Sequence, residues 1–203
     1  AEGTRILKIN AGDVAAGYKN PGQFVQIKKG DGKPSFFAIA SAPSADGNTL
    51  EFLVKEAESN AWLCEAGSGE QLSMSAVMGN GFAIAENFEG YKYDFPVQNV
   101  LLVCTGTGIA PIKAAIESGR LEVGENDVFG RSCRLYWGVR SDKHIAYSEE
   151  LAAWEARGIE VVPVLSGGGS GGFGGAESTR HGYVQQALAA DGVRVPRNTG
   201  GLL

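Results

Sequence analysis

The sequence predicts two domains: an N-terminal antiparallel Greek-key β-barrel over residues 1–95 and a C-terminal doubly wound α/β domain with a parallel sheet over residues 96–203. Two observations lead to this prediction. The first half contains short strand candidates separated by glycine-rich turns, which is typical of a β-barrel. The second half alternates continuous apolar strands with helical segments, which is typical of a doubly wound α/β domain. The pattern changes near residues 93–97, where we expect the boundary.

Composition excludes several classes of protein. Of the 203 residues, 43% are hydrophobic and 20% are charged, so the chain is not intrinsically disordered over most of its length. The 18 basic and 23 acidic residues give a net charge of −5, which offers no general basic field for nucleic acid or anionic lipid. No apolar run approaches the ~20 residues of a transmembrane helix. Three widely spaced cysteines and two histidines predict buried thiols and no metal site.

In the first half, one short helix is expected over residues 60–65, with Ser59 as its N-cap. The extended candidates are residues 25–27, 36–40, 50–55 and 71–75.

In the second half, residues 99–104 form a continuous apolar run, as expected of a parallel strand buried on both faces. Residues 166–175 include seven glycines and predict a mobile loop. Further strands are expected over residues 134–139 and 159–165, and helices over residues 111–117, 148–157 and 182–190.

Both ends of the chain are unusual. It begins without an initiator Met, and it ends in an apolar, strand-like run over residues 199–203. We expect that a targeting peptide preceded this sequence and that the natural protein continues beyond it.

A glycine-rich turn follows the apolar strand and opens a helix. Its candidate binding residues are Thr105, Gly106, Thr107, Gly108 and Pro111. Glycine permits a positive φ and lets the backbone approach a pyrophosphate, while a helix N-terminus supplies N–H groups and partial positive charge. Pro111 suits the first helical turn. The spacing is not G-x-G-x-x-G, and a purely structural strand–helix turn is the alternative.

The run Gly-Thr-Gly-Ile-Ala-Pro over residues 106–111 resembles the nicotinamide-dinucleotide loop of the ferredoxin–NADP reductase superfamily. The expected order of the two domains agrees with that family. The resemblance implies FAD and NADP or NAD as cofactors, with Thr107 nearest the nicotinamide. It is closest to plant and algal flavoproteins of the "fruit protein" type, which implies a chloroplast location.

Residues 35–38, Ser-Phe-Phe-Ala, resemble the family's flavin strand Arg-x-Tyr-Ser, and Ile-Ala-Ser follows as in the family. The resemblance implies that Phe37 stacks on the isoalloxazine, as an aromatic face can. Ser35 replaces the arginine that holds FAD pyrophosphate, and Ala38 replaces the hydroxyl near flavin N5. The implied flavin contacts on this strand are Phe36, Phe37, Ala38, Ile39 and Ser41.

A second segment resembles the family's flavin-lining strand and the helix start that receives the pyrophosphate. The implied contacts are Leu53, Val54, Lys55, Ser59, Asn60 and Ala61. Lys55 is the cation expected to compensate for the lost arginine, as a point charge rather than a fork. A plain helix N-cap at Ser59 is the alternative.

For the coenzyme's adenosine half, the resemblance implies Arg140 as a phosphate contact, Ser166 at the 2′-phosphate of NADP, and Tyr183 with Gln185 at the adenine. Gly167 stands where the family has an arginine. We therefore predict weak discrimination between NADPH and NADH, with any preference resting on Ser166, Arg180 and Tyr183.

Two functions are compatible with these residues. The first is an FAD-dependent oxidoreductase that passes hydride or electrons between NAD(P)H and an unidentified acceptor, with Phe37 and Thr107 at the reacting rings. The second is a non-catalytic or regulatory subunit of a larger plastid assembly, which the replacements at Ser35, Ala38 and Gly167 favour. No nucleic-acid partner and no transmembrane segment are expected.

Overall fold

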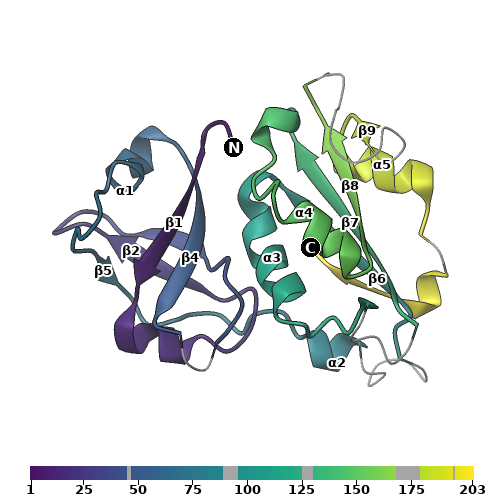
Figure 1. Ribbon diagram of the computed structural model, residues 1–203, viewed down its shortest axis with the longest axis horizontal. Helices are drawn as coiled ribbons and strands as arrows, with labels where there is room; N and C mark the ends of the chain where they lie inside the picture. Colours follow the sequence, from purple (N-terminus) through teal and green to yellow (C-terminus); the bar gives the residue numbers. More distant parts are fainter. Residues whose placement is uncertain (45–46, 89–95, 125–129, 168–178, 194) are drawn as a thin grey trace. The chain divides into compact units, whose positions relative to one another are not determined.

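The computed structural model describes the whole chain except residues 45–46, 89–95, 125–129, 168–178 and 194 (Figure 1). It forms two compact units. The β unit comprises Gly3–Phe82 and Ala110–Ser118, and the α/β unit comprises Ala1–Glu2, Ala83–Ile109 and Gly119–Leu203. The antiparallel part followed by a parallel α/β part is confirmed. The predicted boundary after residue 95 adjoins residues outside the described part and stays a prediction.

The described part of the β unit contains two antiparallel sheets. In one, β1 (Thr4–Asn10) pairs with β4 (Thr49–Lys55). In the other, β2 (Phe24–Lys28) lies between β3 (Ser35–Ala38) and β5 (Ser73–Met74). A bridge between Ile39 and Phe52 joins the sheets, and both of these side chains are fully buried. One core, which also contains Val25, Ile27 and Leu63, therefore stabilises the whole unit.

Short helical segments connect the strands of the β unit. They are the turns η1 (Gly12–Gly17) and η2 (Glu58–Asn60) and the helix α1 (Ala61–Cys64). Strand β1 was not predicted from the sequence, because Arg5, Lys8 and Asn10 interrupt its apolar residues. The strand expected over residues 71–75 is shorter than expected, since only Ser73 and Met74 pair with β2.

The α/β unit contains a parallel sheet in the order β10–β6–β7–β8–β9. Its strands are β6 (Asn99–Thr105), β7 (Ser132–Val139), β8 (Ile159–Leu165), β9 (Arg180–His181) and β10 (Thr199–Leu202). From β6 the chain proceeds through β7 and β8 to β9, and β10 then joins the other edge of β6. The direction of strand order therefore reverses between β6 and β10, where doubly wound sheets bind ligands at their carboxyl edge.

The helices connect these strands. They are α2 (Ile84–Phe88), α3 (Ile109–Glu117), α4 (Leu151–Ala156) and α5 (Val184–Asp191), with short turns η3 (Gly106–Gly108), η5 (Asp142–His144) and η6 (Pro196–Asn198). Helix α3 groups with the β unit from Ala110 onward. There the buried Lys113 ammonium lies 3.3 Å from Glu51 Oε1 and 2.7 Å from Glu117 Oε2.

The expected burial of β6 on both faces is wrong for one face. Val100, Leu102 and Cys104 are buried, whereas Leu101 and Val103 are only half-buried. Leu101 and Val103 pack against the cluster that α5 covers. Helix α5 has eight residues and spans about 12 Å, which is too short to cover the whole length of this sheet face.

A buried arginine ties the start of β7 to its surroundings. Arg131 donates hydrogen bonds to the carbonyl oxygens of Val97, Leu121 and Phe88, at 2.8, 3.2 and 3.0 Å. Its guanidinium also pairs with Glu122 at 2.9 Å. Because a buried charge is costly unless paired and hydrogen-bonded, this arginine fixes the segments around it.

Candidate functional site

The glycine-rich turn lies at the carboxyl edge of the parallel sheet, beside the reversal of strand order. Strand β6 ends at Thr105, and the turn η3 leads directly into α3. Gly106 has φ +50°, and no heavy atom lies within 4 Å of the position that its Cβ would occupy. Both Gly106 and Gly108 are exposed. The turn therefore has room for a phosphate group against its backbone, next to a helix N-terminus.

The neighbouring strand holds this turn in place. Trp137, which is 1% exposed, donates a hydrogen bond from Nε1 to the Gly106 carbonyl oxygen at 3.0 Å. At Gly138, a Cβ would lie 3.0 Å from Thr105 Cγ2 and 2.6 Å from Val184 Cγ2. Neither Trp137 nor Gly138 is among the site residues predicted from the sequence. A glycine inside a strand is the signal for such a close approach.

Two other predicted binding residues belong to the same turn and to the helix that follows it. Thr107 is half-buried within η3. Pro111 is the third residue of α3, within the first turn, where a backbone N–H has no intrahelical partner.

The carboxyl ends of β7 and β8 are tied closely together. Ser166 N donates to Val139 O at 3.0 Å, and Gly167 N donates to Arg140 O at 2.8 Å. A Cβ on Gly167 would lie 2.6 Å from the Arg140 carbonyl oxygen. Position 167 therefore favours glycine for a structural reason, and an arginine there would require the backbone to shift.

At the start of α5, Tyr183 is 60% exposed, so its ring is accessible. Its backbone N–H donates to Gln186 Oε1 at 3.1 Å. Gln185 is exposed, and the side chain that caps the helix is that of Gln186, which is not among the predicted site residues. An amide three residues after the N-cap was the available signal.

Arg180 is already paired, which opposes the coenzyme role expected for it. Its Nε lies 3.2 Å from Asp191 Oδ1, and Asp191 Oδ2 accepts a hydrogen bond from the Tyr136 hydroxyl at 2.8 Å. Burial raises the pKa of Tyr136, opposed by the hydrogen bond from Arg134. Desolvation acts to raise the pKa of Asp191, but the hydrogen bonds from Tyr136 and Arg180 hold it below the usual value. This network anchors the end of α5.

In strand β3, which the resemblance assigns to the flavin, the two phenylalanines point to opposite faces of the sheet. Phe36 is 64% exposed and meets Phe24 edge to face, with 5.8 Å between ring centroids. Phe37 is half-buried and packs against the core of the β unit. The stacking role of Phe37 stays a prediction, and the more accessible ring is that of Phe36.

At several positions that the resemblance assigns to the flavin, only backbone groups are available to a ligand. The side chains of Ile39, Leu53 and Val54 are buried. Ser41 Oγ accepts a hydrogen bond from Glu51 N at 3.1 Å, and Ser41 O accepts one from the Tyr18 hydroxyl at 2.9 Å. The chain directly after β3 pairs with β4 at the Ile39–Phe52 bridge, and Ala40 N donates a hydrogen bond to Glu51 O at 2.7 Å.

The expected N-cap at Ser59 is wrong. The N-cap of α1 is Asn60, whose Oδ1 accepts from Ala57 N at 2.9 Å and whose Nδ2 donates to Lys55 O at 2.8 Å. These hydrogen bonds hold the turn η2 that precedes the helix, and the Asn60 side chain makes no capping hydrogen bond to α1. Ser59 and Lys55 are exposed, and Ala61 is half-buried. Helix α1 has only four residues, so its terminus contributes little to an anion site.

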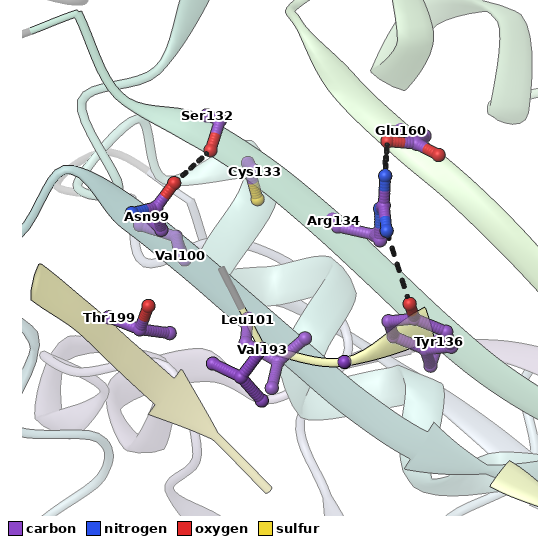
Figure 2. A pocket seen from close by; sticks show the side chains of 11 residues that line it. Asn99, Val100, Leu101, Ser132, Cys133, Arg134, Tyr136, Glu160, Val193 and Thr199 are labelled. Carbon is purple, nitrogen blue, oxygen red and sulfur yellow. Dashed lines mark hydrogen bonds and ion pairs between the residues drawn. The ribbon is translucent and has the colours of Figure 1, made fainter. Parts of the chain in front are cut away.

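A separate groove of about 80 Å³ lies at the amino ends of the parallel strands (Figure 2). Its polar groups pair with one another: Ser132 Oγ with Asn99 Oδ1 at 2.8 Å, and Arg134 Nη2 with Glu160 Oε2 at 2.7 Å. The groove lies at the strand ends opposite the glycine-rich turn, and the side chains that line it include none of the predicted site residues.

Within the part of the chain that the structure describes, no group of three or more His, Cys, Asp or Glu side chains is placed to hold a metal ion. No helix of the described segments is long and apolar enough to cross a bilayer.

Comparison with known proteins gives one domain match and several relatives. Residues 102–200 match the oxidoreductase NAD-binding domain. The fruit protein pKIWI502 of Actinidia deliciosa is 31% identical over 202 residues, covering 94% of this chain and 59% of that protein. An NAD(P)H-flavin reductase of Vibrio harveyi is 25% identical over 146 residues, covering 71% of this chain and 59% of that enzyme. The chain thus spans 59% of the length of both relatives.

Solved structures share the fold. A ferredoxin NADP⁺ reductase of Neisseria gonorrhoeae with bound FAD and NADP has a TM-score of 0.73 at 18% identity, covering 98% of this chain and 77% of that one. A cytochrome P450 reductase of Amycolatopsis has a TM-score of 0.72 at 22% identity, covering 99% of this chain and 56% of that one.

Proposed function

Because the chain belongs to the ferredoxin–NADP reductase superfamily, we propose that it is an FAD-dependent oxidoreductase that passes hydride or electrons between NAD(P)H and an acceptor still to be identified. The observation that carries the proposal is the open turn at Gly106, at the carboxyl edge of a doubly wound sheet. The NAD-binding match begins three residues before this turn, at residue 102.

The residues of this turn fit a nicotinamide dinucleotide. The space beside Gly106 is empty to 4 Å, so a pyrophosphate has access to the backbone N–H groups. The Gly106 carbonyl oxygen accepts a hydrogen bond from Trp137 Nε1, so this oxygen, which would repel an anion, is directed toward the indole. Thr107 supplies a hydroxyl at the apex, and Tyr183 supplies an accessible ring for an adenine.

The β unit offers a partial fit to FAD. Phe36 presents an exposed ring that can contact a flavin. Lys55 and Ser59 are the exposed side chains for a pyrophosphate. When bound, FAD would supply the exchange between two-electron and one-electron transfer. This chain's residues would bind the ring, orient it and limit its contact with water.

The test is a flavin titration of the longest natural form of the protein. We expect bound FAD with a flavin absorbance band, and bleaching of that band under anaerobic NADPH or NADH. A protein that retains FAD but is not reduced by either coenzyme would contradict the proposed activity.

A non-catalytic subunit is the second candidate, and two residues favour it. Ser35 and Ala38 lack the guanidinium and hydroxyl that the family's flavin strand carries. Failure to bind FAD, combined with stable association in a larger complex, would favour this candidate. The chloroplast location implied by the resemblance stays a prediction.

A further inference from the structure

Strand β1 has one paired edge and one free edge (Figure 1). It pairs with β4 along Thr4–Asn10, and within the described residues no strand pairs with its other edge. A groove of about 530 Å³ lies along this free edge, between residues 6–10 of β1 and the segment 66–72. All of its lining residues belong to the β unit, and none is a predicted cofactor contact. Five residues of a strand extend about 17 Å, which is long enough for several pairs with a further strand.

The register of β1 with β4 decides which backbone groups face the groove. Directly before β1, Glu56 N donates to Gly3 O at 2.9 Å in the same register. Hydrogen-bonded pairs alternate along antiparallel strands, so the odd-numbered residues of β1 bond to β4. The N–H and C=O groups of Ile6 and Lys8 therefore point to the free edge. Among the described residues, no partner is recorded for these four groups.

The opposite wall of the groove is held by its own contacts. Glu70 N donates to Gly67 O at 3.2 Å, and Glu70 Oε2 accepts a hydrogen bond from Gly67 N at 3.1 Å. Lys29 forms an ion pair with the same carboxylate. A Cβ at Gly67 or Gly69 would meet no heavy atom within 4 Å, so the space beside this wall is open. The wall therefore keeps its conformation without an occupant.

The side chains of the groove favour an apolar occupant that also carries a carboxylate. Four apolar lining residues pack with the core of the β unit: Leu7, Ile9, Leu63 and Leu72. Ile6 is 46% exposed and offers a further apolar neighbour. The exposed Lys8 ammonium lies 3.8 Å from Glu51 Oε2, and Lys113 lies 3.3 Å from the other oxygen of that carboxylate. Because Lys8 shares its partner with a second lysine, an acidic side chain on an adjacent strand would complement it.

An extended peptide fits these features, because its backbone carries N–H and C=O groups along both edges at the spacing of a strand. Strand β1 of a second copy has only one free edge, since β4 holds the other, so it does not fit a groove with two walls. We propose that the groove binds an extended segment of a partner protein as an additional strand on β1. The segment has apolar side chains at alternate positions and an acidic side chain beside Lys8.

The first experiment measures amide hydrogen exchange in the full chain by NMR. In the unbound protein, the amides of Ile6 and Lys8 should exchange at least about tenfold faster than those of Leu7 and Ile9, which bond to β4. The probe is the synthetic peptide acetyl-Thr-Val-Glu-Val-Thr-Val-amide at about 1 mM. We expect the peptide to slow exchange at Ile6 and Lys8 at least about threefold, as occupancy of the edge requires.

The second experiment removes hydrogen-bond donors from each partner. Ile6→Pro removes the N–H that faces the groove but no hydrogen bond to β4, and Ile6→Val keeps this N–H. In an NMR titration, Ile6→Pro should weaken binding of the peptide about 3- to 10-fold, and Ile6→Val less than about twofold. On the unaltered protein, a peptide of the same sequence with N-methylated valines should bind at least about tenfold more weakly, because it lacks the donors of one edge.

Three results would overturn the inference. One is unchanged exchange at Ile6 and Lys8 with the peptide present, which would show an unoccupied edge. Another is equal binding of the N-methylated peptide, which would show that strand pairing contributes nothing, and this result decides even if Ile6→Pro unfolds. The third is a dimer of the unaltered chain, seen by light scattering, that Ile6→Pro abolishes while remaining folded. Such a dimer would assign the edge to a second copy of the chain.

Discussion

Adjacent phenylalanines in β3 have opposite environments, because successive side chains in a strand point to opposite faces. Phe37 lies opposite Val25, which is fully buried, whereas Phe36 lies opposite Gln26 and is 64% exposed. Sequence similarity alone favours Phe37 as the flavin-stacking residue. The structure makes Phe36 a competing candidate.

The two alanine variants separate these assignments. We expect Phe36→Ala to weaken FAD binding about 3- to 10-fold, from the loss of an aromatic contact, with little change in stability. Phe37→Ala should instead lower the free energy of unfolding by roughly 1–3 kcal/mol, less than for a fully buried phenylalanine. Fluorescence titration of FAD and urea unfolding measure both effects. Weakened FAD binding in Phe37→Ala alone would support the original assignment.

At Gly106, the φ of +50° and the open space beside it together carry the proposal of a phosphate site. Gly106→Val places a β-branched side chain in the left-handed region and fills the space that a phosphate requires. We expect at least tenfold weaker binding of NADPH with FAD still retained. Gly30→Val is the matched control, because Gly30 has φ +52° and equally open surroundings but lies in the β unit. Equal NADPH binding in the two variants would make the Gly106 turn merely structural.

The elements themselves were largely predictable, whereas their contacts were not. The strand over residues 159–165 has the predicted bounds because its apolar residues are buried along nearly its whole length. Strand β1 was missed because half of its residues face solvent. The roles of Trp137 and Gly138 depend on the pairing of β6 with β7, and strand register over a distance of 33 residues has no local signature. The same limit applies to Arg180, whose partner Asp191 follows eleven residues later.

The hydrogen bonds of Asp191 at the end of α5 lead to a prediction about how the stability of the fold depends on pH. Hydrogen bonds from Tyr136 and Arg180 lower the pKa of Asp191 from its ordinary value of 3.8. A carboxyl group whose pKa is lowered in the folded state stabilises the fold at pH values above its pKa in the unfolded chain. This contribution disappears as the pH falls through the pKa of the folded state. Asp191→Asn should therefore lower Tm at pH 7, and the difference from the unaltered protein should shrink below about pH 4. Glu155→Gln, at an exposed position of α4, is the control. A difference that persists unchanged at pH 3 would contradict the charge-based role.

At the scale of the whole molecule, each unit has its own hydrophobic core and its own buried thiols. Cys64 belongs to the β unit, whereas Cys104 and Cys133 belong to the α/β unit. Burial raises the pKa of Cys133 to about 12, raises that of Cys104 above the usual range, and also raises that of Cys64. Since the thiolate is the reactive form, all three should react slowly with alkylating reagents in the folded protein. A native thiol that reacts as fast as free cysteine would contradict its burial.

Chemical labelling of these buried thiols can measure the local stability of each unit. A buried cysteine is alkylated only when its surroundings open, so its labelling rate reports the free energy of that local opening. A ligand present at about 100 times its Kd should slow opening of the part that it binds about 100-fold. Residue-resolved mass spectrometry should therefore show FAD protecting Cys64, and NADPH protecting Cys104, which directly precedes Thr105. The same cysteines that carry no chemistry of their own would then report, without any turnover assay, which cofactor occupies which half of the chain.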